Sequence, residues 1–250
     1  MNASPVPLDK FVLTIQKLSL ARDLDTVMKI VRDGARDITG ADGATFILKE
    51  NDQCFYADEN AIAPLWKGNR FPINSCVSGW AMKHRKAVII EDIFLDERIP
   101  IDLYQPTFVK SMAMVPIRTI DPIGAIGNYW ATKHTPTAQE VTILQSLADF
   151  TAIALENVNI YSELEQRVKA RTAELEDANK GLEAFSYSVS HDLRAPLRTI
   201  HTYIGILKEE CDGILNDRNK QITGKIQRKV EEMQRLIDNL LSFFSLGSRE

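Results

Sequence analysis

The 250-residue chain contains 44% hydrophobic and 26% charged residues and has a formal net charge of −4, which is typical of a globular protein and offers no basic surface for nucleic acid. No apolar run is long enough to span a membrane, the first residues do not resemble a signal peptide, and the three cysteines lack metal-binding spacing. We therefore expect a reduced, cytoplasmic chain with no membrane span, no metal site and no nucleic-acid partner.

The first half of the chain mixes helical and strand patterns. Asp23 can cap a helix that ends naturally at Gly40. Two strands, over 44–50 and 53–58, are joined by a turn at Asn51 and Asp52. A short helix over 77–86 and three further strands over 87–90, 111–118 and 122–132 are expected after them. This pattern predicts an α+β domain, with an antiparallel sheet and flanking helices.

From Thr137 onward the pattern is helical. Thr137 and Glu140 form a capping box before an apolar run. Apolar residues then recur at alternating steps of three and four as far as Val189, which is typical of a coiled coil. Beyond Tyr161 only this narrow seam stays apolar. The pattern therefore favours a parallel dimer over a long helix that packs within one monomer.

The segment 185–197, FSYSVSHDLRAPL, places a histidine beside an acid on the predicted helix. The apolar seam takes three successive four-residue steps here, so His191 must lie on the outer side of the helix. Pro196 cannot donate a hydrogen bond to the carbonyl of Asp192, and a bend is expected there. An exposed imidazole beside a carboxylate can act as a nucleophile whose proton is managed by its neighbour.

The motif SHDLRAPL, residues 190–197, resembles the H-box of sensor histidine kinases, and FSYSVSHDLRAPLR is similar to the version in phytochrome-like kinases. The resemblance implies that His191 accepts the γ-phosphoryl group of ATP, that Asp192 orients the other ring nitrogen and acts as the base, and that Pro196 supplies the helix bend. Arg194 would either position phosphate or be a solvated helix residue. Ala195 stands where many relatives carry the Thr or Asn that assists dephosphorylation of the regulator.

A second helix with apolar residues from Ile222 to Phe244 is expected after the loop 212–217. Two such hairpins would form the dimeric four-helix bundle of the family. The resemblance implies protein-histidine kinase activity (EC 2.7.13.3), with the phosphoryl group passing to an aspartate of a response-regulator receiver domain. The Mg-ATP-binding domain of the family has no recognisable motif here. We expect such a domain to act in cis, beyond Glu250, or in trans.

The stretch 96–118, DERIPIDLYQPTFVKSMAMVPIR, is similar to GAF domains, and this resemblance covers about residues 8–160. GAF domains hold small ligands against their sheet, which implies a set of aromatic residues that either line a pocket or form plain core. These candidates are Trp66, Phe71, Trp80, Tyr104, Phe108 and Tyr129. We expect no bound cofactor, and in particular no bilin, because neither Cys54 nor Cys76 is followed by histidine.

The predicted organisation is a GAF sensor domain over 1–160, a coiled-coil signalling linker over 161–184, and a dimerisation and histidine-phosphotransfer domain over 185–250. Two other functions are compatible with the sequence. The first is a phosphorelay carrier without its own ATPase. The second is a non-enzymatic dimeric GAF module that senses light or a ligand, in which His191 is incidental.

Overall fold

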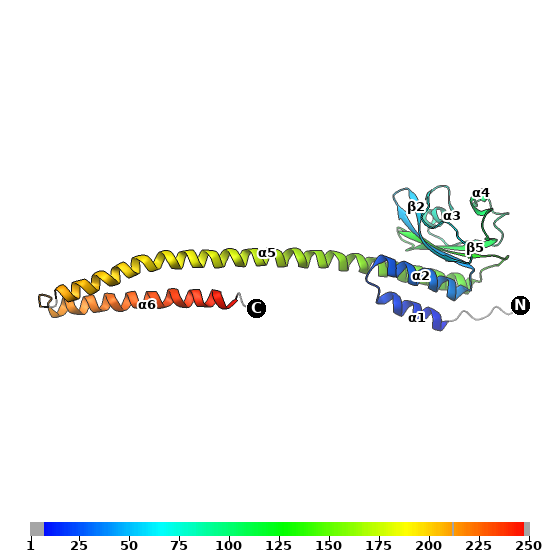
Figure 1. Ribbon diagram of the computed structural model, residues 1–250. Helices are drawn as coiled ribbons and strands as arrows, with labels where there is room; N and C mark the ends of the chain where they lie inside the picture. Colours follow the sequence, from blue (N-terminus) through cyan, green and yellow to red (C-terminus); the bar gives the residue numbers. More distant parts are fainter. Residues whose placement is uncertain (1–7, 212, 248–250) are drawn as a thin grey trace. The chain divides into compact units, whose positions relative to one another are not determined.

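The computed structural model describes residues 8–211 and 213–247 and divides the chain into two units, Met1–Leu164 and Glu165–Glu250 (Figure 1). Helix α5, Ala138–Glu210, contributes to both units. Residues 1–7 and 248–250 of the two predicted terminal domains, and Asp212 of the predicted loop, lie outside the described residues. None of the helices that are described combines the length and apolar character of a membrane span.

The first unit is built on a six-stranded antiparallel sheet with the strand order β3-β2-β1-β6-β5-β4. The strands are β1 (Gly43–Glu50), β2 (Gln53–Ala61), β3 (Arg70–Pro72), β4 (Val88–Ile90), β5 (Ser111–Ile117) and β6 (Gly124–Trp130). The sheet confirms the predicted α+β class. Strand β3, with three residues, lies outside the elements predicted from the sequence.

Helices cover both faces of this sheet (Figure 1). They are α1 (Leu8–Ser19), α2 (Leu24–Thr39), α3 (Val77–His84), α4 (Ile101–Tyr104) and the beginning of α5. Successive residues of β5 serve different cores, because strand side chains alternate between faces. Val115 packs into the core under α1, α2 and α5, whereas Met114 packs into the core with α3 and α4. The aromatic candidates belong to this second core.

Local capping explains where two helices begin. The Asp23 carboxylate accepts a hydrogen bond from the Thr26 backbone N–H at 2.8 Å, and Gly40 ends α2 in the left-handed conformation with φ 65°. At α5 the Thr137 N–H donates to Glu140 Oε2 at 2.7 Å, and the Glu140 N–H donates to Thr137 Oγ1 at 3.2 Å. This reciprocal pair is the predicted capping box, which satisfies backbone donors that the helix itself leaves unpaired.

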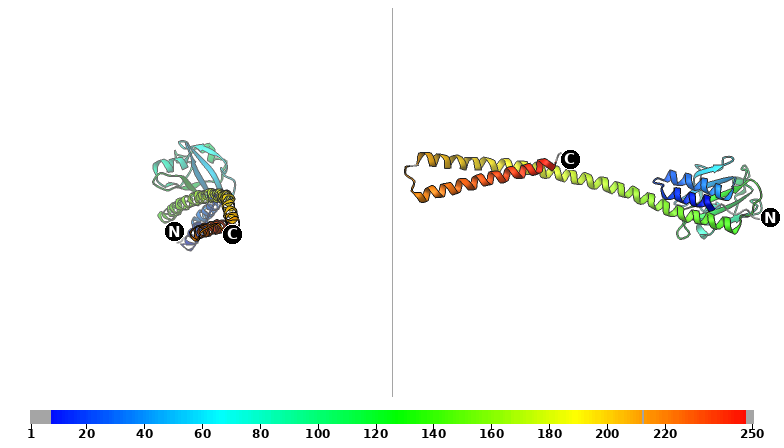
Figure 2. Two further views of the ribbon diagram at one scale, coloured as in Figure 1. Left: turned by 90° about the vertical axis from the view of Figure 1, so that its left-hand side faces the viewer. Right: turned by 90° about the horizontal axis from the view of Figure 1, so that it is seen from below.

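The second unit is a helical hairpin. Helix α6, Asp217–Gly247, runs antiparallel to the last part of α5 (Figure 2). Its small internal core consists of Leu197, Ile204, Val230 and Ile237. The hairpin confirms the predicted all-α fold. The side chain of Phe244, the last apolar position predicted for this helix, lies outside the described side chains.

Candidate functional site

His191 lies on α5 with 75% of its side chain exposed, and its Nδ1 atom is 3.3 Å from Asp192 Oδ1. The carboxylate can accept a hydrogen bond from Nδ1–H, which favours the tautomer in which Nε2 carries the lone pair. Nε2 is then the nucleophilic nitrogen of an imidazole that solvent and other proteins can reach. This arrangement is suited to attack on an electrophile brought from outside the hairpin.

The rotation of α5 about its axis explains why His191 is exposed. Ser190 is buried at 1% exposure and Leu197 is buried in the hairpin core, so the face that carries both is turned towards α6. His191 follows Ser190 by about 100° of helical rotation and is carried to the outside. Within the described residues the Ser190 hydroxyl is buried without a hydrogen-bond partner.

Arg194 connects the two helices of the hairpin. Its Nη2 atom donates to Asp238 Oδ1 at 2.6 Å, and both side chains are partly exposed. No local sequence pattern indicates this partner, because Asp238 lies on the returning helix and the contact depends on hairpin register. Pro196 is exposed within α5, which remains helical on both sides of it. The bend expected at Pro196 and the two alternative roles of Arg194 stay predictions.

Most of the aromatic candidates in the first unit meet in one cluster. Trp66 packs on Tyr104 with ring centroids 4.6 Å apart and on Tyr129 at 5.5 Å. Tyr56, which is not among the predicted residues, contacts both Trp66 and Phe71. Its ring centroid lies 5.6 Å from that of Trp66 and 5.3 Å from that of Phe71. The sequence could have indicated Tyr56, because side chains alternate between the two faces of a strand and Tyr56 therefore lies on the same inward face as Cys54.

Two of the six aromatic candidates lie at the border of this cluster. Phe108 is partly buried against the same core. Trp80 is also partly buried, but it stacks on the His84 ring at 4.0 Å and lies under the Arg98 guanidinium at 5.1 Å. The rings of the central members touch one another directly, as side chains of a packed core do. Their role in holding a ligand stays a prediction.

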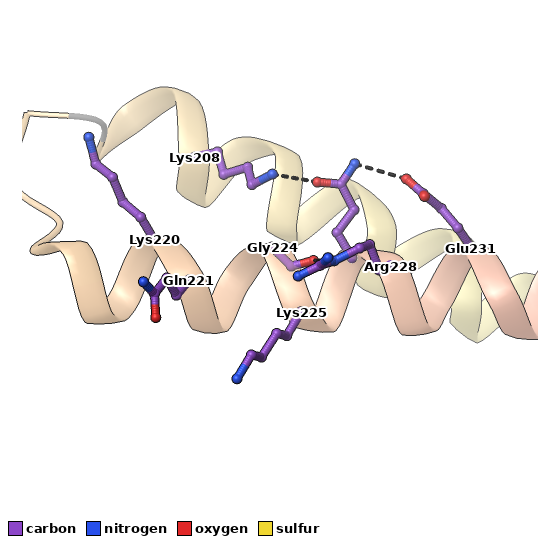
Figure 3. A pocket seen from close by; sticks show the side chains of 8 residues that line it. Lys208, Lys220, Gln221, Gly224, Lys225, Arg228 and Glu231 are labelled. Atoms are coloured by element: carbon purple, nitrogen blue, oxygen red, sulfur yellow. Dashed lines mark hydrogen bonds between the residues drawn. The ribbon is translucent and has the colours of Figure 1, made fainter.

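A positively charged hollow of about 470 Å³ lies on the hairpin, further along α5 than His191 (Figure 3). Lys208 comes from α5, and the other lining residues come from α6. These are Lys220, Gln221, Gly224, Lys225, Gln227, Arg228 and Glu231. Lys208 Nζ donates to Gln227 Oε1 at 2.5 Å, which ties the two helices together at this point. The four cations and one acid give the hollow a positive charge that suits an acidic surface.

Two family models match the chain. One is described as a GAF domain and matches residues 21–156, and the other is described as a His Kinase A (phospho-acceptor) domain and matches residues 182–249. The two matches confirm the resemblance drawn from the motif at 190–197 and from the stretch 96–118.

Three curated relatives are similar to parts of the chain. Cyanobacterial phytochrome B of Nostoc sp. is 43% identical over 74 residues, covering 30% of this chain and 10% of the relative. The methanogenesis regulatory histidine kinase FilI of Methanothrix harundinacea is 29% identical over 57% of this chain and 17% of its own length. The circadian input-output histidine kinase CikA of Synechococcus elongatus is 27% identical over 62% of this chain and 23% of its own length. The chain thus spans less than a quarter of each of these relatives.

Solved structures share the fold of the first unit. The GAF domain of Acinetobacter phosphoenolpyruvate-protein phosphotransferase has a TM-score of 0.55 at 14% identity, covering 64% of this chain and 99% of that one. The chromophore-binding domain of the R. palustris bacteriophytochrome RpBphP3 has a TM-score of 0.56 at 14% identity, covering 64% of each chain. Because the GAF domain model matches more than half of the chain, the chain belongs to the GAF domain family, and it carries, after its GAF domain, the phospho-acceptor domain of the histidine kinases.

Proposed function

We propose that the chain is the sensor and phosphoacceptor part of a two-component protein-histidine kinase. His191 receives the γ-phosphoryl group of ATP and passes it to an aspartate of a response-regulator receiver domain. The observation that carries the proposal is the exposed His191 imidazole with Asp192 Oδ1 at 3.3 Å from Nδ1, inside a His Kinase A domain. We place this activity in the cytoplasm.

The chemistry follows from the tautomer. With the Nδ1–H donated to Asp192, the Nε2 lone pair attacks the γ-phosphorus of Mg-ATP in line with the bond to the bridging oxygen. That bond breaks, ADP leaves, and a new N–P bond forms at Nε2. The positive charge that develops on the ring is stabilised by the Asp192 carboxylate, which accepts the Nδ1 proton as general base. Pro196 supplies the helix bend in this proposal, and Arg194 either positions phosphate or is a solvated helix residue.

The apolar pattern of the hairpin supports the proposed homodimer. On α5, Leu197 and Ile204 are buried against α6, whereas the seam positions that alternate with them are exposed. These positions are Leu193, Ile200 and Leu207. Helix α6 repeats the arrangement with the exposed residues Ile226, Met233 and Leu240. A second hairpin would cover both rows and complete a four-helix bundle.

The proposed coiled-coil linker leads to the same conclusion. Between the GAF fold and the hairpin, the seam residues of α5 are exposed in the single chain. They include Leu164, Val168, Leu175 and Leu182. A narrow apolar seam of this kind is buried when two parallel helices pack side by side. We infer that the partner is a second copy of this chain, and that rearrangement along the linker relays the state of the GAF domain to His191.

The phosphoryl donor is Mg-ATP held by a kinase ATP-binding domain, acting in cis or in trans. Both routes give the same phosphohistidine, and the trans route makes the chain a phosphorelay carrier. We include no bilin in the proposal. Cys54 is buried in β2, Cys76 directly precedes α3, and neither is followed by a histidine.

The test is phosphoryl acceptance by three forms of the chain. Wild type, His191→Ala and His201→Ala are each mixed with labelled ATP and a separately supplied kinase ATP-binding domain. His201 is the matched control, since it is an exposed histidine of the same helix. We expect acid-labile, base-stable label on wild type and His201→Ala, and none on His191→Ala. Label on all three forms would refute the proposal.

A further inference from the structure

The positively charged hollow on the hairpin lies on a different side of α6 from the apolar row proposed for the dimer. Gly224 and Glu231 line the hollow, and each stands two positions before a residue of that row, Ile226 and Met233 respectively. Two positions on an α-helix correspond to about 200° of rotation. A second hairpin that covers the row would therefore leave the hollow, of about 470 Å³, open to solvent.

Hydrogen bonds between the two helices shape the hollow. Lys208 Nζ on α5 donates to Gln227 Oε1 on α6 at 2.5 Å, and Gln227 Nε2 donates to Glu231 Oε1 at 3.0 Å (Figure 3). Arg228 Nε donates to the Gly224 carbonyl at 3.3 Å, which draws the arginine back along α6 over the glycine. A Cβ atom at Gly224 would meet no atom within 4 Å, so the space beside this glycine is open.

The charges of the lining favour an extended anion with several negative charges. Its cations are Lys208, Lys220, Lys225 and Arg228, and the acid is Glu231, so three positive charges remain uncompensated. Lys220 and Arg228 are eight residues apart on α6, which corresponds to about 12 Å along the helix axis. The cations therefore form a row, and an anion with a single charged group would meet only part of it.

The uncharged part of the lining argues against other polyanions. It consists of Gln221, Gly224 and Gln227, and no aromatic or aliphatic side chain is among the described residues that line the hollow. Nucleotide bases are held by stacking on aromatic side chains, and protein partners by buried aromatic and apolar anchors. A flat lipid surface does not enter a concave site. Linked phosphate groups, which carry charge along their whole length, match both the row and the polar lining.

We propose that this hollow binds a short linear polyphosphate, and that the bound anion ties α5 to α6. The Arg228 guanidinium donates hydrogen bonds to phosphate oxygens in the bidentate geometry that suits it, and the lysines supply point charges along the chain of phosphates. Lys208 brings α5 to the same anion. Because the row of cations exists only when the hairpin is folded, binding stabilises the hairpin.

This inference does not rest on the proposed phosphoacceptor function. His191 is not among the residues that line the hollow, and no phosphoryl group is transferred. Binding requires neither an ATP-binding domain nor a response regulator. A chain that binds polyphosphate without being phosphorylated, or is phosphorylated without binding polyphosphate, would decide each proposal separately.

The test is isothermal titration calorimetry of the full chain with tripolyphosphate in magnesium-free buffer. We expect one anion per chain, with an affinity that falls as the salt concentration rises, because dissolved ions screen exposed charges. Arg228→Gln should weaken binding at least about fivefold. Arg235→Gln is the matched control and should bind within about twofold of wild type. Both arginines donate from Nε to the carbonyl four residues earlier, at 3.3 and 3.4 Å, but Arg235 does not line the hollow.

Glu231→Gln tests the sign of the charge effect. The variant removes the acid from the lining and keeps a side chain of the same size, so we expect tripolyphosphate to bind at least about twofold more tightly than to wild type. Weaker binding to Glu231→Gln would contradict recognition by net positive charge. Circular dichroism checks that the variants are folded.

Wild type alone decides the proposal if a variant does not fold, through a comparison of tripolyphosphate with a hexaglutamate peptide and with ATP. We expect tripolyphosphate to bind most tightly of the three. Tighter binding of hexaglutamate would assign the hollow to an acidic protein, and tighter binding of ATP would assign it to a nucleotide, so either result overturns the proposal. Equal affinities of Arg228→Gln and Arg235→Gln, or no binding of tripolyphosphate at low salt, would overturn it too.

Discussion

The Arg194 guanidinium donates a hydrogen bond to Asp238 Oδ1 at 2.6 Å and so joins α5 to α6 one helical turn beyond His191. Both side chains are partly exposed to solvent, and ion pairs of this kind contribute only about 0.2–1 kcal/mol to stability. The contact therefore matters chiefly for hairpin register beside the phosphoacceptor. Because of this contact, the Arg194 guanidinium, which the motif places near His191, is already hydrogen-bonded to Asp238.

Arg194 either positions phosphate or is a solvated helix residue, and the variants Arg194→Ala and Asp238→Ala distinguish these two roles. Both variants lose the ion pair, but only the first loses the guanidinium. We expect each to lower the free energy of unfolding by about 0.2–1 kcal/mol in urea titration and to accept phosphate at similar rates. If Arg194→Ala alone loses phosphoryl acceptance, Arg194 positions phosphate directly and the ion pair is secondary.

Asp192→Asn tests the proposed base. The amide keeps the size of the side chain but cannot stabilise the positive charge that develops on the His191 ring. General-base catalysis contributes roughly 10²–10⁴-fold, and we expect the initial rate of His191 phosphorylation to fall by about 10²-fold at neutral pH. Asp192→Glu should recover part of the rate. If Asp192→Asn is phosphorylated at a rate within a factor of about two of wild type, Asp192 does not act as the general base.

Ile200→Asp tests the dimer. Ile200 belongs to the row of exposed apolar residues on α5, where a second hairpin would bury its side chain. An unpaired carboxylate at that position opposes association because burying its charge is costly. We expect sedimentation at micromolar concentration to show a dimer for wild type and a monomer for Ile200→Asp. Thr202→Asp, an exposed position on the same helix, should remain dimeric, and a wild-type monomer would contradict the seam argument.

The pH profile of alkylation tests the state of Cys76. Iodoacetamide reacts with the thiolate, whose fraction rises with pH, so the lowered pKa of Cys76, which accepts a hydrogen bond from the Gly79 backbone, shifts half-maximal reactivity to lower pH than for an ordinary cysteine. The other titratable groups facing Cys76 are Cys54, Tyr56, Tyr104 and Tyr129, and burial raises the pKa of these tyrosines, so they remain neutral over the relevant range.

The rate at Cys76 is measured in a Cys211→Ser chain by mass spectrometry across the pH range. Ser78→Ala removes a donor to the Cys76 sulfur and is expected to move the profile to higher pH. A wild-type profile that follows free cysteine would show that the site does not stabilise the thiolate.

Features set by neighbouring residues could be predicted from the sequence. The start of α2 at Asp23, its end at Gly40, and the Thr137–Glu140 capping box depend on contacts within a single turn. The exposure of His191 followed from helical periodicity alone. Helix α3 ends at His84, two residues before the predicted end, because Arg85 adopts the left-handed conformation with φ 56°.

Features set by tertiary packing could not be predicted. The contact of Trp66 with Tyr129 joins residues far apart in the sequence, and Arg194 contacts Asp238 only because α6 returns antiparallel to α5. Helix α1 lies outside the predicted elements, as do the short β3 and α4. Elements of three or four residues carry too little periodicity to predict from sequence.

The most direct measurement of the central claim is the location of the phosphoryl group itself. The chain is phosphorylated with ATP and a kinase ATP-binding domain, digested at mildly basic pH to preserve the N–P bond, and fragmented by electron transfer. We predict fragment masses that place the phosphoryl group on His191. A phosphoryl group on Ser190, Asp192 or His201, with His191 unmodified, would contradict the proposed function.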